Sequence, residues 1–203
     1  MILVIKMVGY PNGSKKHINH ATNKADAGKR GMSLEADLNQ SNDYYRLNQI
    51  AVIHKKPTPV QVVTVDYPSR NKARITEAYY RHPSTTDYNG IYKGYYVDFE
   101  AKETKNKTLL PLQFIHPHQL EHLASVEREG AISFVIIRFS SYNETYLVFS
   151  KDLFILLEDK TIKSITLKWI IEHGHRCPFR YQIPCDYLTI VEQERMRRLS
   201  TDE

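Results

Sequence analysis

Acidic and basic side chains alternate in the segment Asp-Phe-Glu-Ala-Lys at residues 98–102. Side chains along a β-strand alternate between its two faces. Asp98, Glu100 and Lys102 are therefore expected on one face, with the two apolar residues between them facing a core. Residues two apart on a strand lie roughly 6.5 Å from each other, so Glu100 and Lys102 can reach one small site. The segment thus brings a carboxylate and a cation to the same place.

A second carboxylate, Asp87, lies thirteen residues before Glu100. Between them lies Asn89-Gly90, a dipeptide typical of tight turns because glycine tolerates positive φ. A turn at this point would fold Asp87 back beside Glu100, and Thr85 would have the same facing as Asp87. We therefore expect these side chains to meet at one site.

Two carboxylates beside a lysine are suited to the hydrolysis of a phosphodiester. That reaction needs a cation to neutralise charge, a hydroxide nucleophile at neutral pH, and a group that orients water or handles a proton. Carboxylate oxygens suit Mg²⁺, which binds through one or two carboxylates together with waters and substrate phosphate. A nearby lysine can stabilise the charge that develops. Asp87, Glu100 and Lys102 thus make up a minimal nuclease site.

The Glu-x-Lys spacing has a simpler explanation, which is a solvated strand face that carries a salt bridge. Roughly one such triplet is expected by chance in a chain with this much glutamate and lysine. Glu103-Thr104-Lys105 repeats the pattern one register later. Facing favours the first triplet, because its alternation leaves Phe99 and Ala101 for the core.

Histidine and cysteine residues offer two other candidate metal sites. One lies where His118 and His122 are a helical turn apart, close to His116, but no fourth ligand is evident. The spacing of the other fits none of the compact zinc patterns, and it consists of His173, His175, Cys177 and Cys185. Surface histidines and reduced thiols account for both sets, and zinc is the less favoured interpretation.

The bulk properties indicate one domain with a sizeable core. The chain has 203 residues and a mass of 23.7 kDa, of which 41% are hydrophobic and 25% charged. The apolar run at residues 1–8 is too short to span a bilayer, and no small-residue cleavage site follows it. With only two cysteines, the chain is predicted to be a reduced cytoplasmic protein with no membrane association.

Positive charge gathers on the N-terminal side of the sequence. The net charge is +5 and the sequence pI is about 9.0. Residues 1–81 hold 13 Lys or Arg and 6 Asp or Glu, whereas residues 82–203 hold 15 and 17. A basic footprint of this kind suits a polyphosphate partner such as nucleic acid. Solubility alone is the alternative explanation.

The elements that must position the site follow from periodicity and turn signals. Residues 1–30 are predicted to be a flexible basic tail, 31–199 a single domain, and 200–203 a C-terminal tail. Two extended arms at about 60–82 predict a protruding hairpin, or stalk, with a basic tip. Helices are expected at 33–48, 117–128 and 188–199 and after caps at Ser150 and Ser164, with strands at 50–53, 60–67, 72–82, 85–88, 91–103, 131–139 and 144–149. This order predicts an α/β fold, with a mixed central β-sheet flanked by helices.

Several contiguous runs resemble the bacterial RecU family of Holliday junction resolvases. The resemblance covers about residues 30–150, and the tails and the last fifty residues fit only loosely. It implies a type II restriction-endonuclease-like core of the PD-(D/E)xK group, a homodimer, and a stalk that projects over the DNA. The runs that carry it are GMSLEADLN (31–39), IAVIHKKPTPVQ (50–61), STTDYNGIYKG (84–94), DFEAKETKNK (98–107) and FIHPHQLEH (114–122).

The resemblance also implies roles for single residues. It makes Lys102 the transition-state stabiliser and Glu35 an additional acidic candidate. The implied metal is Mg²⁺, for which Mn²⁺ can substitute. The strict Pro-Asp dipeptide of the group is absent, since Asp87 follows a threonine. The implied metal ligands are Thr85, Asp87, Glu100 and Gln119.

The basic and aromatic residues are then candidates for DNA binding. Basic side chains contact phosphates without reading sequence. Tyr79 and Tyr80 can stack on bases at the open centre of a junction, with hydrophobic packing of the stalk as the alternative. The basic candidates are Arg30, Lys55, Lys56, Arg70, Lys72, Arg74 and Arg81.

The leading functional hypothesis is a dimeric Mg²⁺-dependent endonuclease that resolves four-way junction DNA by paired symmetric nicks during homologous recombination and DNA repair. Two-fold symmetry explains how one chain cuts two strands alike. One alternative is a nuclease of the same fold that acts on other DNA. Another is a non-catalytic branched-DNA-binding protein that anneals strands or modulates a recombinase partner, a role that would survive removal of Mg²⁺.

Overall fold

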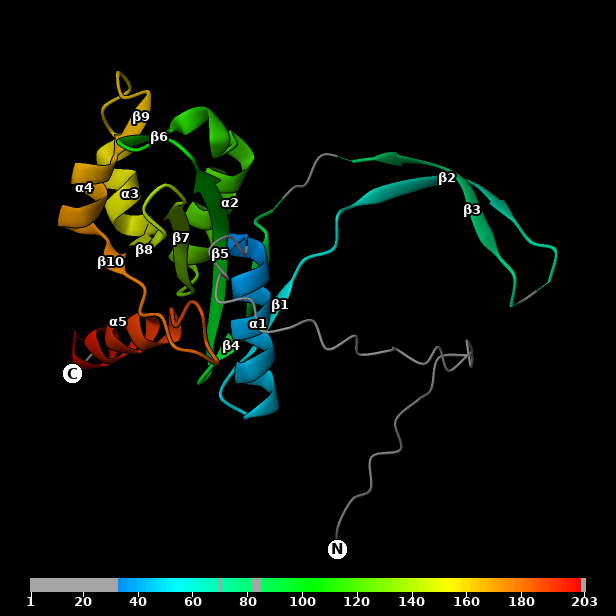
Figure 1. Ribbon diagram of the computed structural model, residues 1–203, viewed down its shortest axis with the longest axis horizontal. Coiled ribbons are helices and arrows are strands. Elements are labelled where there is room, and N and C mark those ends of the chain that lie inside the picture. The colour runs from blue at the N-terminus through cyan, green and yellow to red at the C-terminus, as the bar shows by residue number, and fades with distance from the viewer. Residues whose placement is uncertain (1–32, 70, 82–84, 202–203) are drawn as a thin grey trace, which may run out of the picture. The chain divides into compact units, whose positions relative to one another are not determined.

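The computed structural model describes residues 33–69, 71–81 and 85–201 (Figure 1). They fall into two compact units. One contains the described residues between 58 and 81, and the other contains 33–57 and 85–201. Within the described ranges, no helix is long and apolar enough to cross a membrane. Arg30 and Arg70, both candidates for DNA contact, lie outside the described residues, as does almost all of the predicted N-terminal tail.

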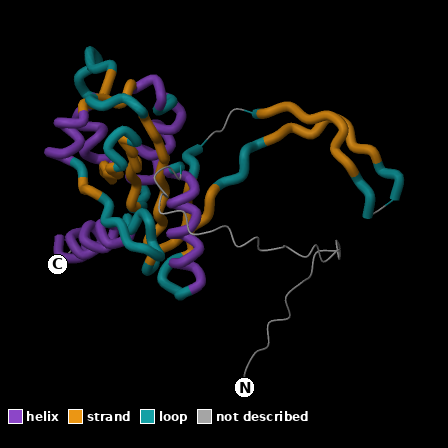
Figure 2. Tube along the Cα trace, viewed as in Figure 1, coloured by secondary structure: helices purple, strands orange, loops and turns teal. Residues whose placement is uncertain are grey.

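A six-stranded mixed sheet forms the centre of the larger unit (Figure 2). The strand order is β1-β4-β5-β7-β8-β10, in which only β5 and β7 pair in parallel. Helix α2 (Pro117–Arg128) lies in the connection between those two strands, which a parallel crossover requires. The strands are β1 (Val52–Lys55), β4 (Tyr88–Tyr92), β5 (Tyr95–Thr104), β7 (Ile132–Phe139), β8 (Glu144–Phe149) and β10 (His175–Arg176).

Helices cover both faces of this sheet and enclose two apolar cores. Helices α1 (Leu34–Leu47) and α5 (Leu188–Thr201) contribute to one core. The other core takes residues from α2, α3 (Ser150–Leu157) and α4 (Leu167–His173). A second small sheet pairs β6 (Leu109–Pro111) with β9 (Ser164–Thr166), and the 3₁₀-helix η1 (Leu112–Phe114) follows β6. The predicted α/β fold with a mixed sheet flanked by helices is confirmed.

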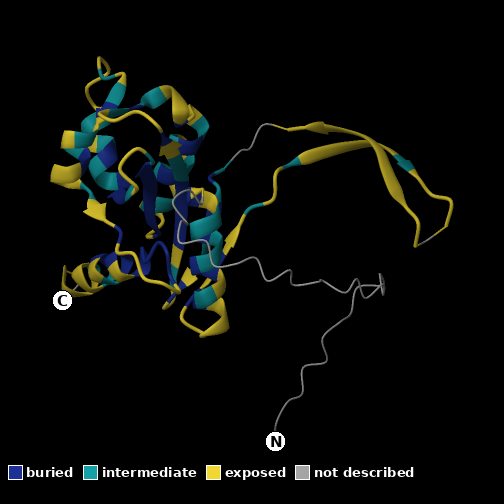
Figure 3. Ribbon diagram, viewed as in Figure 1, coloured by how far each residue is buried: buried dark blue, intermediate teal, exposed yellow. Residues whose placement is uncertain are grey.

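Strand β7 is the most deeply buried element of the sheet. All eight of its residues are buried, as expected for a continuous apolar run between two helical layers (Figure 3). Beside it on β5, Phe99 stacks on Phe134 and on Tyr88, each with ring centroids 4.8 Å apart. These rings anchor the back of β5, so the side chains on its other face have a rigid support.

The turn between β4 and β5 is not where we expected it. Asn89 and Gly90 lie inside β4, and the chain reverses at Lys93-Gly94, where φ is 46° and 86°. Two successive positive φ values are the pattern of a tight hairpin turn. Gly90 has a different role, because a Cβ there would lie 2.0 Å from the carbonyl oxygen of Val52. Glycine is needed for β1 to pair closely with β4.

Other boundaries also differ from the prediction. The first strand begins at Val52 instead of residue 50, and 85–88 is not a strand before Tyr88. Ser150 is the first residue of α3 instead of its cap, and α5 extends two residues beyond the expected end. Residue 164 begins β9, and Thr166 caps α4 by accepting a hydrogen bond from the Trp169 amide at 3.2 Å. Because serine and threonine are both good caps, the pattern alone could not distinguish these positions.

The smaller unit is an antiparallel hairpin of β2 (Val60–Asp66) and β3 (Arg74–Tyr80), which confirms the pairing expected of the two arms. Its register shifts near Val62 and Thr64. Almost every residue of both strands is exposed (Figure 3). A two-stranded hairpin is marginally stable alone in water, so a surface this open suits contact with another molecule.

Candidate active site

Three of the predicted site residues meet on one face of the sheet. Asp87 immediately precedes β4, and Glu100 and Lys102 lie two residues apart on β5. The Asp87 amide donates a hydrogen bond to Glu100 Oε2 at 3.2 Å. The Lys102 Nζ lies 2.7 Å from Glu100 Oε1. The strand alternation therefore places these groups together as predicted.

Glu100 is a buried carboxylate with few partners. Its side chain is 0% exposed. Burial, followed by the nearby negative charge of Asp87, raises the pKa of Glu100 to about 8, although Lys102 opposes the shift. Among the described residues no group donates a well-directed hydrogen bond to Oε1, so the Lys102 contact is a short ion pair only. The site thus holds a carboxyl group whose ionised form lacks a cation.

That deficit fits a divalent metal ion. Within the described ranges no three His, Cys, Asp or Glu side chains cluster into a metal site. Two carboxylates, Asp87 and Glu100, do lie together. Mg²⁺ suits such a pair, because it binds proteins through one or two carboxylates and keeps several waters. A bound cation would also favour the ionised form of Glu100.

The other two candidate ligands are not joined to these three residues. Thr85 is half-buried beside Asp87, and Gln119 is buried in the first turn of α2. The Gln119 side-chain oxygen accepts a hydrogen bond from the His116 amide at 2.9 Å, which caps the helix. A carbonyl oxygen has two lone pairs, so this contact leaves one acceptor site on Gln119. Metal binding by Thr85 and Gln119 stays a prediction.

Glu35 lies on the α1 side of the sheet. It forms an ion pair with Lys55, with 2.6 Å between Oε1 and Nζ, and its side chain is 57% exposed. Its charge contributes to the raised pKa of Tyr88, for which burial is the larger cause. No hydrogen bond or ion pair of the described residues links Glu35 to Glu100, so its place as an additional acidic residue stays a prediction.

Asp98 is fully buried on the same face as Glu100, and sequence reasoning assigned it no role. Four side chains from separate elements converge on its carboxylate: Lys56, Thr86, Tyr96 and His122. Alternation along the strand predicted the facing of Asp98, but its partners come from distant parts of the chain. Two of them had been assigned elsewhere, Lys56 to DNA phosphates and His122 to a candidate metal cluster.

The remaining metal candidates are dispersed. His116 and His118 stack with ring centroids 5.5 Å apart, whereas His122 contacts Asp98. Cys177 and Cys185 are free and buried. The buried Cys177 thiol hydrogen-bonds with Cys185, which raises its pKa well above the usual range, with burial as a second cause. A thiol held protonated in this way is a poor metal ligand.

The hairpin carries the described DNA-binding candidates. Lys72 and Arg74 are exposed, and Arg81 is exposed with its Nε donating to Gln61 at 3.1 Å. Tyr79 is 61% exposed and Tyr80 is 85% exposed, so neither ring is buried within the hairpin. The open faces leave these rings available for stacking, which stays a prediction.

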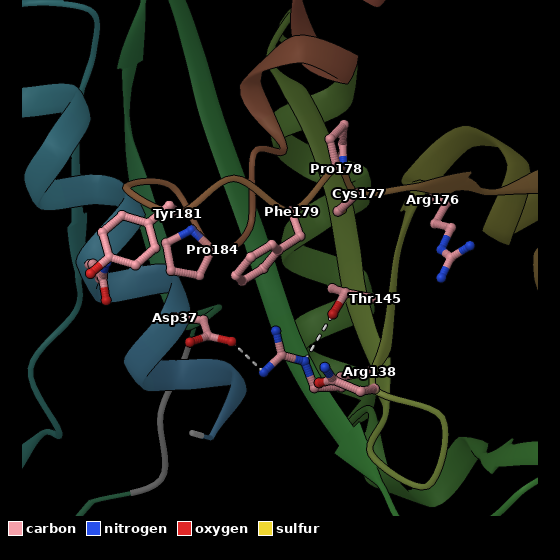
Figure 4. Close-up of a pocket in the computed structure, with 11 residues that line it drawn as sticks. Asp37, Arg138, Thr145, Arg176, Cys177, Pro178, Phe179, Tyr181 and Pro184 are labelled. Atoms are coloured by element: carbon pink, nitrogen blue, oxygen red, sulfur yellow. Dashed lines mark hydrogen bonds and ion pairs between the residues drawn. The ribbon is translucent and has the colours of Figure 1, made fainter. Parts of the chain in front are cut away.

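A separate cavity of about 490 Å³ lies on the opposite side of the sheet. Arg138 at its floor pairs with Asp37 of α1 at 2.7 Å and donates to Thr145 at 2.8 Å (Figure 4). The Asp98 face, by contrast, contacts His122 of α2. Phe179 and Tyr181 line the mouth of the cavity and are largely exposed. This cavity is therefore distinct from the carboxylate site.

Comparison with known proteins agrees with the site. A family model described as Recombination protein U (RecU) matches residues 29–193. A relative from Geobacillus kaustophilus, named Holliday junction resolvase RecU, is 52% identical over 90% of this chain and 95% of its own. A relative of the same name from Staphylococcus aureus is 49% identical over 92% of this chain and 95% of its own.

A solved structure also resembles the chain. It is that of the Holliday junction resolvase Hjc from Archaeoglobus fulgidus, which is 12% identical over 70% of this chain and 94% of its own, with a TM-score of 0.40. That similarity is too low to support any conclusion about this chain. The family match spans most of the sequence, and the relatives are about half identical over nearly their full length. This chain therefore belongs to the RecU family.

Proposed function

We propose that this chain is a Mg²⁺-dependent endonuclease that resolves four-way DNA junctions by paired symmetric nicks in recombination and repair. The observation that carries the proposal is the buried Glu100 carboxylate, which has a second carboxylate and a lysine beside it and lacks a full set of partners. The names of the chain's relatives supply the substrate.

The residues would divide the work as follows. Asp87 and Glu100 would hold the metal, with the side chains of Thr85 and Gln119 as further oxygen ligands. Bound Mg²⁺, with Mn²⁺ as a substitute, would supply charge neutralisation and a water of lowered pKa. Lys102 has an 18% exposed side chain beside Glu100, so its ammonium group can face both the carboxylate and an incoming phosphate. It would stabilise negative charge as that charge develops.

DNA binding would rest mainly on the hairpin. Lys72, Arg74 and Arg81 are exposed cations that can contact phosphates, and Tyr79 and Tyr80 are exposed rings that can stack on unpaired bases. Lys55 could join them if its exposed ion pair with Glu35 opened. Arg30 and Arg70 complete the proposed set from outside the described residues.

A homodimer would account for two matched nicks, because a two-fold axis presents two identical sites. The hairpin also exposes apolar side chains, including Val62, Val63 and Ile75, which a second copy could cover. We place this activity in the cytoplasm, where a recombinase could act on the same DNA.

The substrate can be tested by comparing a labelled four-way junction with a linear duplex of the same sequence, each incubated with the protein and Mg²⁺. Symmetric nicks near the crossover, with little cutting of the duplex, are the expected result. Equal cutting of both would favour a nuclease of general specificity. Tight junction binding without cleavage would favour the strand-annealing or recombinase-modulating role instead.

A further inference from the structure

The Asp98 carboxylate is the most heavily contacted side chain near the candidate active site. Its Oδ2 lies 3.1 Å from Lys56 Nζ, 2.9 Å from the Tyr96 hydroxyl and 3.1 Å from His122 Nε2. The Thr86 hydroxyl donates to Oδ1. The group is 0% exposed, so water cannot replace any of these partners. A fully buried carboxylate with four partners is a fixed point in the structure.

Lys56 connects that point to Asp87. Its side chain contacts both Asp98 and the Thr86 hydroxyl, the latter at 2.9 Å. Its backbone amide donates to the carbonyl oxygen of Asp87 at 2.7 Å. Residues 85–87 belong to neither a helix nor a strand. The contacts through Lys56 and Thr86 therefore do for Asp87 what strand pairing does for Glu100.

Two neighbouring lysines allow the two possible roles of Lys56 to be separated. Lys55 lies on the α1 side, paired with Glu35, and its side chain is 37% exposed. Lys56 lies on the Asp98 side, and its side chain is 20% exposed. A phosphate contact by Lys56 would require it to leave a buried carboxylate, which costs far more than opening an exposed pair.

We infer that Lys56, Thr86 and Asp98 form a positioning cluster that holds the Asp87 carboxylate opposite Glu100, and that Lys56 does not contact DNA. The inference rests on the proposed function, because it assigns Asp87 to the metal site. Partners of metal-binding residues commonly change metal affinity or activity 10–100-fold when they are removed.

The test uses Lys56→Met, which keeps the length of the side chain and removes its charge, with Lys55→Met as the matched control. We expect Lys56→Met to weaken Mn²⁺ binding to the free protein roughly 10-fold, measured by titration calorimetry. Its single-turnover cleavage rate at saturating enzyme should fall roughly 10²-fold. Its junction affinity and the salt dependence of that affinity should stay as in the wild type.

A second pair of variants tests the hydroxyl in the cluster. Thr86→Val removes the hydroxyl at nearly constant volume and should reduce Mn²⁺ binding and cleavage in the same way. Thr86→Ser keeps the hydroxyl and should restore both, a rescue that a general packing defect would not show. Thermal unfolding of each variant checks that the fold is retained at the assay temperature.

The outcomes are distinguishable. A Lys56→Met protein that cleaves at the wild-type rate when saturated, but loses about 0.9 from its salt slope, would make Lys56 a phosphate contact and overturn the inference. Unchanged Mn²⁺ affinity in both Lys56→Met and Thr86→Val would overturn it as well. If the wild type failed to cleave junctions, the proposed function would fall, whereas the Mn²⁺ titration would still test the positioning cluster.

Discussion

Two buried glutamates in this chain have opposite electrostatic environments. Glu194 on α5 is 4% exposed, and burial alone would raise its pKa. Hydrogen bonds from Arg197, Lys151 and Arg198 outweigh burial and lower the pKa to about 2. Glu100 is 0% exposed with one cation and a neighbouring carboxylate, and burial followed by Asp87 raises its pKa to about 8.

The difference separates a structural carboxylate from a functional one. Where Glu194 ties α5 to α3 through Lys151, the fold supplies every charge that the buried group needs. At Glu100 the fold leaves that requirement incomplete. An uncompensated carboxylate is costly, so its presence on the best-packed strand pair indicates a ligand that brings positive charge.

The largest expected effect comes from removing either carboxylate of the site. Asp87→Ala and Glu100→Gln should each reduce junction cleavage about 10³-fold or more, because the metal would lose half of its carboxylate ligands. Junction affinity, measured by gel shift without Mg²⁺, should change little. Glu194→Gln is the control, and it should cleave normally at a temperature where it is folded. Cleavage retained by Asp87→Ala would refute the site assignment.

Glu194→Gln should have the largest effect on stability. It leaves three cations around an uncharged group, and losing one partner of a buried ion cluster costs on the order of 3 kcal/mol. Urea unfolding monitored by circular dichroism would measure this loss. Glu100→Gln should be as stable as the wild type or more so at neutral pH, because it removes a group that is destabilised when ionised. Equal losses in both variants would remove the distinction between the two glutamates.

The two glutamates should also give opposite pH dependence. A raised pKa means that the Glu100 contribution to stability is present below its ordinary pKa of 4.5 and is lost as pH rises through about 8. The lowered pKa of Glu194 means that its contribution is present above 4.5 and is lost as pH falls through about 2. Unfolding free energies of the wild type minus each Gln variant, measured across pH, would show these two trends.

The smallest expected effect lies on the hairpin, away from either glutamate. Arg74→Ala removes an exposed cation from β3, so it should lower junction affinity a few-fold and reduce the salt slope by about 0.9. The single-turnover cleavage rate at saturating enzyme should not change. An unchanged salt slope would show that this part of the hairpin makes no phosphate contact.

Strand patterns could be predicted where one segment contains the whole signal. The Asp-x-Glu-x-Lys alternation placed Glu100 and Lys102 correctly, and the apolar run of β7 was recognised from its residues alone. The β4–β5 turn was misplaced because Asn-Gly is a stronger turn signal than Lys-Gly. Gly90 in fact permits the close approach of β1, a tertiary reason that local sequence does not contain.

Features that depend on distant partners could not be predicted. The four contacts to Asp98 join residues 56, 86, 96 and 122, and no spacing rule connects them. The Glu194 cluster likewise needs Lys151 from another helix. Exposed and buried lysines look alike in sequence, so Lys55 and Lys56 received the same assignment although the sheet places them on opposite faces.

The central claim is that Asp87 and Glu100 together hold a divalent cation. Its most direct test is a crystal structure of the protein grown with Mn²⁺, with anomalous diffraction to locate the metal. We predict an anomalous peak in contact with both carboxylates, within reach of Thr85 and Gln119 oxygens, and its loss in an Asp87→Ala crystal. A peak at the histidines of α2, or no peak beside Glu100 at saturating Mn²⁺, would contradict the account.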